Sequence, residues 1–248
     1  MNAEQSMSED IESSVKAGRQ VGHEGPWRIQ VGDGSLQFRS VVVHDPVLTG
    51  AQILAAAGVH DQAEYLAYQM LASGLLEEIN PEETTDIRAG LAARFVVFKS
   101  DRSFRLLLDD RALDWGASHI SGGTLRALSG REEPGLVVWQ DLRDQADLLV
   151  LDDDLVDLGA PGVERFYMRE CKFDIFVNGT PEIVHTPCLS YWDVIKLGFP
   201  SASPQDNMVY TIDYSAGPRQ NPEGALSEGE SVRVKDRMKF YVTPSDKS

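Results

Sequence analysis

Residues 172–199 read KFDIFVNGTPEIVHTPCLSYWDVIKLGF, and this stretch decides the fold. Its first part places an apolar residue at every second position of 173–177. It then reaches Asn178-Gly179, the dipeptide that best accepts the positive φ angles of a type I′ hairpin turn. We therefore predict two antiparallel strands, the second over residues 183–185. Ser190 is a typical N-cap residue, and the apolar spacing after it predicts a short amphipathic helix.

The same order of hairpin and helix occurs twice earlier in the chain. FRLLLDDRALDW turns at Asp109-Asp110 and precedes a helix capped by Ser121, while WRIQVGDGSLQFRSVVV turns at 32–34 and precedes a helix capped by Thr49. The three capping residues are 72 and 69 residues apart. A second landmark, a basic residue followed by an aromatic one in the closing strand, recurs after 71 and 74 residues, at Arg94-Phe95, Arg165-Phe166 and Lys239-Phe240. Two landmarks with one period predict tandem domains.

A hairpin, a helix and further strands within about 70 residues is the order of the β-grasp fold, in which a mixed sheet wraps one helix. We predict an α+β protein with a disordered N-terminal arm over 1–26. Three β-grasp domains follow over 27–101, 102–170 and 171–248, joined almost without linkers.

The composition is that of a globular protein, with 42% hydrophobic and 25% charged residues among 248. No apolar run reaches the length of a membrane span, and the acidic start is unlike a signal peptide, so we expect a cytoplasmic protein without a membrane partner. The formal charge of −16 argues against nucleic acid. Two cysteines, Cys171 and Cys188, are expected to be buried or half-buried free thiols.

The third unit resembles the bacterial multi-ubiquitin domain. The similarity is carried by the VNG turn, SYWDVIKLGF, MVYTIDYSAG, GESVRVKDRMKFYV and the VTPSDKS tail. Residues 27–248 as a whole are similar to the three-unit ubiquitin-like proteins of bacterial ubiquitination-like operons. The resemblance implies partners of the E1-like, E2-like and JAB-type peptidase classes, in systems associated with phage defence. It also implies self-assembly into a homo-oligomer, a dimer or a filament, with bound calcium.

The sequence does not indicate an enzyme. It lacks a phosphate-cradling glycine loop, a metalloprotease helix motif and a nucleophile elbow. We interpret the scattered histidines as structural or surface residues; they are His23, His44, His60, His119 and His185. We therefore expect a non-enzymatic protein.

One acidic run has the composition of a metal site. Asp152, Asp153, Asp154 and Asp157 offer four carboxylates in six positions, and calcium takes six to eight oxygen ligands in irregular geometry. An EF-hand is excluded because Val156 stands where a ligand is needed. A partial calcium site completed by a second subunit is our hypothesis, and a solvated acidic loop is the alternative.

Asp109-Asp110 is a second candidate for the same ion, with hairpin-turn chemistry as the alternative. The unit that contains both candidates is the most acidic, with 14 Asp and Glu against 8 Lys and Arg over 102–170. Like charges would keep copies apart, so a divalent ion between them would promote assembly.

The C-terminal stretch separates two functions. Some members of the family that this chain resembles are conjugated to other molecules through a terminal glycine. Here the last glycine is Gly229, and the chain ends SDKS. This departure favours self-assembly over the alternative, a modifier conjugated through its C-terminus by E1-like and E2-like partners. We also expect residues 243–248 to be mobile.

Overall fold

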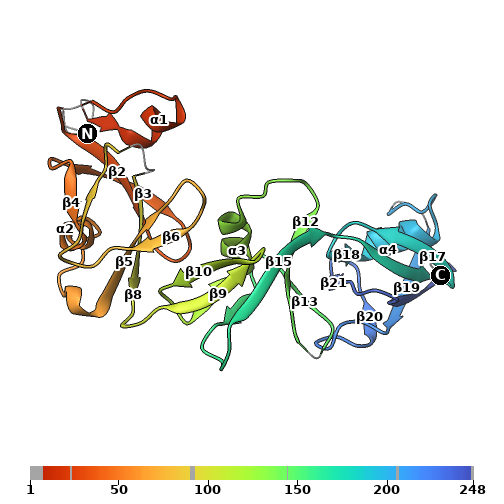
Figure 1. Cartoon of the computed structure of the whole chain (residues 1–248). Coiled ribbons are helices and arrows are strands. Elements are labelled where there is room, and N and C mark those ends of the chain that lie inside the picture. Colours follow the sequence, from red (N-terminus) through yellow and green to blue (C-terminus); the bar gives the residue numbers. More distant parts are fainter. Residues whose placement is uncertain (1–7, 23, 90–92, 144, 205–206, 247–248) are drawn as a thin grey trace. The chain divides into compact units, whose positions relative to one another are not determined.

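A computed structural model describes residues 8–22, 24–89, 93–143, 145–204 and 207–246 (Figure 1). Three tandem repeats, each with a mixed sheet and one helix, confirm the predicted α+β class and β-grasp arrangement. The chain divides into two compact units, Met1–Arg131 with Val138–Met168 and Glu132–Val137 with Arg169–Ser248. Among the described residues, no helix is both long and apolar enough to cross a membrane.

The first repeat builds its sheet around β2, which pairs antiparallel with β3 and parallel with β8, as the β-grasp order requires. Thr49 caps α2 in a capping box with Gln52, which confirms the predicted cap. The elements are β2 (Trp27–Gly32), β3 (Phe38–Val43), β4 (Val47–Thr49), α2 (Gly50–Ala56), a 3-10 turn (Gln62–Glu64), β5 (Tyr65–Met70), β6 (Leu76–Glu78), β7 (Thr84–Asp86) and β8 (Arg94–Lys99).

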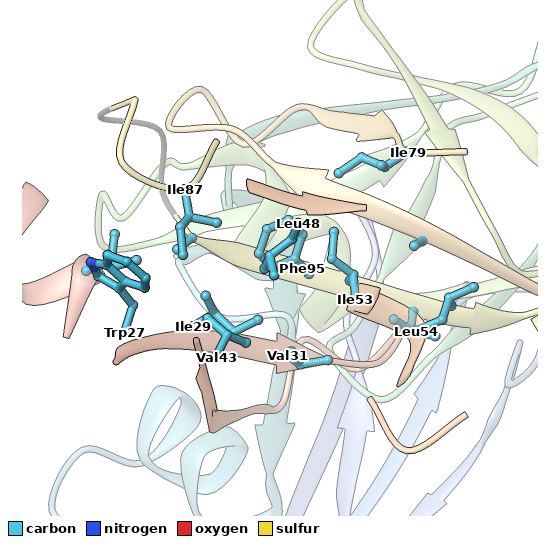
Figure 2. Packing of buried hydrophobic residues seen from close by; sticks show 14 of the residues in the cluster. Trp27, Ile29, Val31, Val43, Leu48, Ile53, Leu54, Ile79, Ile87 and Phe95 are labelled. Atoms are coloured by element: carbon cyan, nitrogen blue, oxygen red, sulfur yellow. The ribbon is translucent and has the colours of Figure 1, made fainter. Parts of the chain in front are cut away.

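The core of this repeat lies between the sheet and α2 (Figure 2). Ile29 and Phe95 on the sheet and Ile53 on the helix are fully buried. Each such side chain stabilises the fold by about 1.5–3 kcal/mol relative to exposure. The alternation of apolar residues along β2 therefore fixes which face of the sheet meets the helix.

The second repeat has the sheet order β10-β9-β15-β12-β13. Asp109 and Asp110 form its hairpin turn with φ of 48° and 60°, a left-handed conformation that aspartate tolerates better than most residues. Ser121 caps α3 by accepting a hydrogen bond from the Thr124 amide. The elements are β9 (Phe104–Leu108), β10 (Arg111–Trp115), β11 (His119–Ser121), α3 (Gly122–Ser129), β12 (Leu136–Gln140), β13 (Leu148–Val150), β14 (Leu155–Asp157) and β15 (Glu164–Glu170).

The third repeat has the equivalent sheet order, β17-β16-β22-β19-β20. Asn178 and Gly179 both have positive φ, as the predicted type I′ turn requires, and Ser190 caps α4 with Asp193. The elements are β16 (Phe173–Val177), β17 (Thr180–Val184), β18 (Cys188–Ser190), α4 (Tyr191–Gly198), β19 (Met208–Ser215), β20 (Gly224–Leu226), β21 (Ser231–Arg233) and β22 (Lys239–Asp246).

The prediction of a mobile end was wrong for residues 243–246. They extend β22, which stays paired with β19 as far as Asp246 opposite Met208. Their polar side chains suggest mobility, but backbone hydrogen bonds to a neighbouring strand do not require apolar side chains. Residues 247–248 lie outside the described part of the chain.

The disordered arm predicted over 1–26 was also wrong for the described residues. β1 (Glu9–Asp10) pairs in parallel with β2, and α1 (Ile11–Lys16) follows it. Ile11 is completely buried, and the Glu9 carboxylate accepts hydrogen bonds from the Ser14 hydroxyl and the Gly22 amide. This segment is held by contacts with the first repeat, which its polar composition does not reveal. Residues 1–7 and His23 lie outside the described part.

Both cysteines are free thiols, Cys171 buried and Cys188 half-buried, as predicted. Burial, with a smaller contribution from Cys188, raises the pKa of Cys171 to about 11. Cys171 is therefore a packing residue with little thiolate character near neutral pH.

Candidate functional site

The acidic loop at 151–154 holds the start of helix α3. Its backbone carbonyls accept the first helical amides, with Gly122 donating to Asp154 at 3.0 Å and Gly123 to Asp152 at 3.0 Å. The Asp154 side chain closes the loop, because its Oδ2 accepts the Leu151 amide at 2.9 Å. Amides at a helix N-terminus lack partners within the helix, so this loop satisfies two of them.

The same acidic turn recurs in the other repeats. The Glu83 carboxylate accepts the Asn80 amide three residues earlier, and the Glu230 carboxylate accepts the Ser227 amide in the same way. The carbonyls of Glu83 and Glu230 also accept the first amides of α2 and α4. Asp154 is thus the second repeat's version of a structural acid, and its conformation is explained without a metal ion.

The other carboxylates of the run have separate surroundings. Asp152 Oδ1 accepts hydrogen bonds from Arg126 on α3 at 3.0 and 2.7 Å. Asp157 Oδ1 accepts the Gly159 amide at 2.8 Å, and Asp153 is exposed. An arginine beside Asp152 opposes a cation there, since it already neutralises that carboxylate.

Asp109 and Asp110 serve the second repeat's hairpin. Asp109 Oδ1 accepts the Met168 amide at 2.9 Å, which ties the turn to β15. Asp110 pairs with Arg165 at 3.3 Å. Both line an open depression of about 540 Å³ that also contains Arg111 and Arg131. Three arginines in one depression disfavour a divalent cation, so turn chemistry accounts for this pair.

Within the described residues, no three His, Cys, Asp or Glu side chains gather as a metal-binding group. The six predicted ligands therefore do not converge in one copy of the chain. Calcium takes at least about six oxygens. A complete cage in a single copy does not fit this arrangement.

Within the described residues, one surface of the first repeat binds another domain. It is the side of the sheet that faces away from α2, and we call it the open face. Tyr68 and Val96 are fully buried there, and Phe98 is 4% exposed, although none of the three belongs to the core beneath the helix. The Phe98 ring stacks edge-on against Trp115 of the second repeat at 4.7 Å between centroids. The second repeat therefore covers the open face of the first.

Close approach at this contact depends on small residues and on polar bonds. A Cβ added to Gly116 would lie 2.5 Å from the Phe98 ring. The Thr124 hydroxyl donates to the Gly34 carbonyl at 3.3 Å, and the Arg111 guanidinium donates to the Ser73 carbonyl at 2.9 Å. Apolar packing with hydrogen bonds at its edge is typical of a permanent interface, and most of both repeats falls in one compact unit.

Sequence reasoning missed this contact, although a signal was present. Residues 94–99 read RFVVFK, and a run of apolar residues without alternation indicates a strand that is buried on both faces. The α2 side accounts for Phe95 and Val97. The opposite side, with Val96 and Phe98, needed a second partner, and the neighbouring repeat supplies it.

The chain has three β-grasp repeats, acidic turns that cap their helices and a sheet face that binds a neighbouring repeat. These features define a tandem ubiquitin-like protein. The Multiubiquitin family model matches residues 35–100, 104–170 and 173–246, which is most of the chain. The protein therefore belongs to the multiubiquitin family, as the sequence resemblance indicated. Among curated proteins, none matches the chain.

Proposed function

We propose that this chain is a non-enzymatic, cytoplasmic ubiquitin-like protein of a bacterial ubiquitination-like pathway that acts by self-association in phage defence. It would dock on E1-like, E2-like and JAB-type peptidase partners and assemble into dimers or filaments. The supporting observation is the buried contact between Phe98 and Trp115, in which the open face of one repeat accepts another repeat of the same family. A protein made of such repeats has the means to bind further copies of itself.

Calcium enters this proposal only as an ion shared between copies. The acidic loop of one copy offers Asp153 freely, whereas Asp152 and Asp154 already accept hydrogen bonds within the chain. Two such loops facing each other would bring their two Asp153 carboxylates together, with backbone carbonyls and waters as the further ligands, and binding the ion would remove the repulsion between the loops. Magnesium would substitute poorly because it demands tighter octahedral geometry.

Light scattering with calcium, magnesium or EDTA tests this role. We expect calcium to raise the apparent mass and EDTA to lower it. Asp152→Asn with Asp153→Asn should abolish the response while leaving the Asp154 turn intact. Glu77→Gln with Glu82→Gln removes two charges from the first repeat and serves as the control, which should respond like the wild type. Indifference of the wild type to calcium would exclude the ion but not self-association.

Conjugation through the C-terminus is the alternative. It receives no support from residues 243–246, because an enzyme acting on this stretch would first have to separate β22 from β19. Incubation with an E1-like partner and ATP, followed by mass spectrometry, decides between the two functions. We expect no covalent adduct, and an adduct at the C-terminal carboxylate would replace self-assembly with conjugation.

A further inference from the structure

We propose that two copies of this chain associate by exchanging residues 8–22, which we call the N-terminal segment. The segment of each copy then occupies the site on the first repeat of the other copy. This inference rests on the proposed self-association and gives it a route. The segment contains β1 and α1, and α1 packs beside β2 of its own chain (Figure 1). The segment and its site lie within the same compact unit.

The N-terminal segment completes one edge of the first repeat's sheet. β8 pairs with β2 from Gln30 onwards, and β1 pairs with Trp27 and Arg28 at the preceding end of β2. In this pairing the Glu9 amide donates to the Pro26 carbonyl at 3.0 Å. No other described strand pairs with that end of β2 on this side. If the segment leaves, β2 therefore offers a free edge that can accept a strand from another chain.

The apolar anchors of the N-terminal segment are small compared with its length. Ile11 is completely buried and Val21 is 5% exposed, and both belong to the core cluster of the first repeat. Residues 16–20 are exposed. Burial of two aliphatic side chains offsets only part of the conformational entropy that is lost when the whole segment becomes ordered. The segment therefore opens at a lower free energy than the strands of the sheet beneath it.

Polar contacts make the site specific for this segment. Three of them join the segment to β2 and β8, and they are Ser8 with Arg28, Gly22 with Trp27 and Glu12 with Arg94. They lie at the two ends and in the middle of the segment, so the site recognises its sequence along its length. A second copy of the chain carries the same sequence and makes the same contacts. The site therefore fits a second copy without any new complementarity.

The connection between the segment and β2 favours exchange. Its two ends are held together, because the Trp27 indole donates to the Gly22 carbonyl at 3.1 Å. A Cβ added to Gly25 would lie 2.6 Å from the Trp27 ring, so the connection is tightly folded. Short, tight connections of this kind promote exchange between copies. Each copy has one segment and one site, so reciprocal exchange satisfies both sites and gives a closed dimer.

The length of the connection tests the exchange. Deletion of Glu24 and Gly25 leaves the segment and its site unchanged but prevents the segment from reaching the site in its own chain. The effective concentration of the chain's own segment then falls towards zero, so we expect the dimer dissociation constant to fall by about tenfold or more. Insertion of Gly-Ser-Gly-Ser after Glu24 is the matched control and should raise it. Sedimentation velocity of the full chain over a concentration series in EDTA measures both.

A pair of cysteines reports which chain supplies the segment. Asp10 and Arg28 are register partners on adjacent strands, which lie about 4.8 Å apart, and this separation suits a disulfide. In the variant with Asp10→Cys and Arg28→Cys, mild oxidation of the dimer should link two chains. The Asp10→Cys single variant is the control and should stay unlinked, and it also reports any linkage through the native Cys171 or Cys188.

Loss of the buried anchor should weaken the dimer. We expect Ile11→Asp to raise the dimer dissociation constant by about tenfold or more. Leu155→Asp, at a 70% exposed apolar residue, adds the same charge and should leave the dimer unchanged. Circular dichroism melts check that both variants remain folded.

Separate results would overturn the exchange and the self-association. A shortened connection that leaves the chain monomeric, a disulfide within one chain in the dimer, or dimers that persist in Ile11→Asp would overturn the exchange and leave self-association standing. A wild-type chain that stays monomeric at every concentration, with and without calcium, would overturn self-association itself.

Discussion

At the scale of single residues, two adjacent glycines at the start of α3 have opposite structural requirements. A Cβ on Gly122 would lie 2.1 Å from the Leu151 carbonyl oxygen of the acidic loop, a distance that the backbone cannot accept. A Cβ on Gly123 would meet the Asp152 carbonyl at 3.4 Å, which is ordinary contact. The loop therefore packs against one glycine and leaves room at the next.

We predict that Gly122→Ala lowers the free energy of unfolding by about 1–3 kcal/mol, because the loop must move away from the helix. Gly123→Ala should be neutral or raise it by up to about 1 kcal/mol, since alanine lowers the entropy of the unfolded chain and favours the helix. Urea unfolding of both variants measures this difference. Equal effects of the two substitutions would contradict the packing of the acidic loop on α3.

The helix caps and the acidic turns differ in how well sequence predicts them. Thr49, Ser121 and Ser190 are recognisable because a cap bonds to an amide three residues ahead, which is local information. Asp154 is different, since its turn contacts the start of a helix that lies about 30 residues earlier in the chain. A run of aspartates therefore suggests a metal ion until the structure shows that Asp152, Asp154 and Asp157 accept hydrogen bonds from the protein.

At the scale of elements, the segment of β1 and α1 depends on an ion pair. Glu12 bonds to Arg94 of β8 and lies 2.6 Å from Lys16, and the Arg94 bond above all holds the pKa of Glu12 below its ordinary value. A carboxylate with a depressed pKa in the folded state stabilises that state at pH values above its unfolded pKa. This contribution is lost as the pH falls through the folded value.

Glu12→Gln should therefore destabilise the chain at neutral pH, and its difference from the wild type should disappear in acid, where Glu12 is protonated in both states. Thermal unfolding of both proteins from neutral pH to about pH 3 measures this, a range that includes the ordinary glutamate pKa of about 4.3. Lys16→Ala is the control, because the Lys16 side chain is 70% exposed and its pair contributes little. The melting temperatures of Glu12→Gln and the wild type could instead differ by the same amount at every pH in this range. That result would show that the contact with Arg94 does not depend on the charge of Glu12.

The sequence predicted elements well where their pattern is local. The hairpins at Asp109-Asp110 and Asn178-Gly179 follow from turn chemistry. It failed at β1 and at the end of β22. Each of these is short or polar, and each is a strand only because a neighbouring strand offers free backbone groups.

At the scale of the whole molecule, periodicity predicted three domains but not how their faces are used. Spacing shows that a unit recurs, whereas the pairing of Phe98 with Trp115 depends on shape, on the lack of a side chain at Gly116 and on the path of the chain between repeats. The same limit applies to Tyr241, whose alternation with buried Phe240 and Val242 predicts exposure but no partner. Charge is the whole-molecule property that separates the possible partners.

We predict that self-association in EDTA strengthens as sodium chloride rises from about 0.01 to 0.15 M, because the Debye length falls from about 30 to 8 Å and screens the repulsion between copies. An apolar contact between copies is itself little affected by this change. Carboxylates bridged by an ion would respond in the opposite direction, since salt weakens charge attraction. Sedimentation velocity at each salt concentration measures the effect. Association that is strongest at the lowest salt would show that opposite charges hold the copies together and would contradict an apolar contact between them.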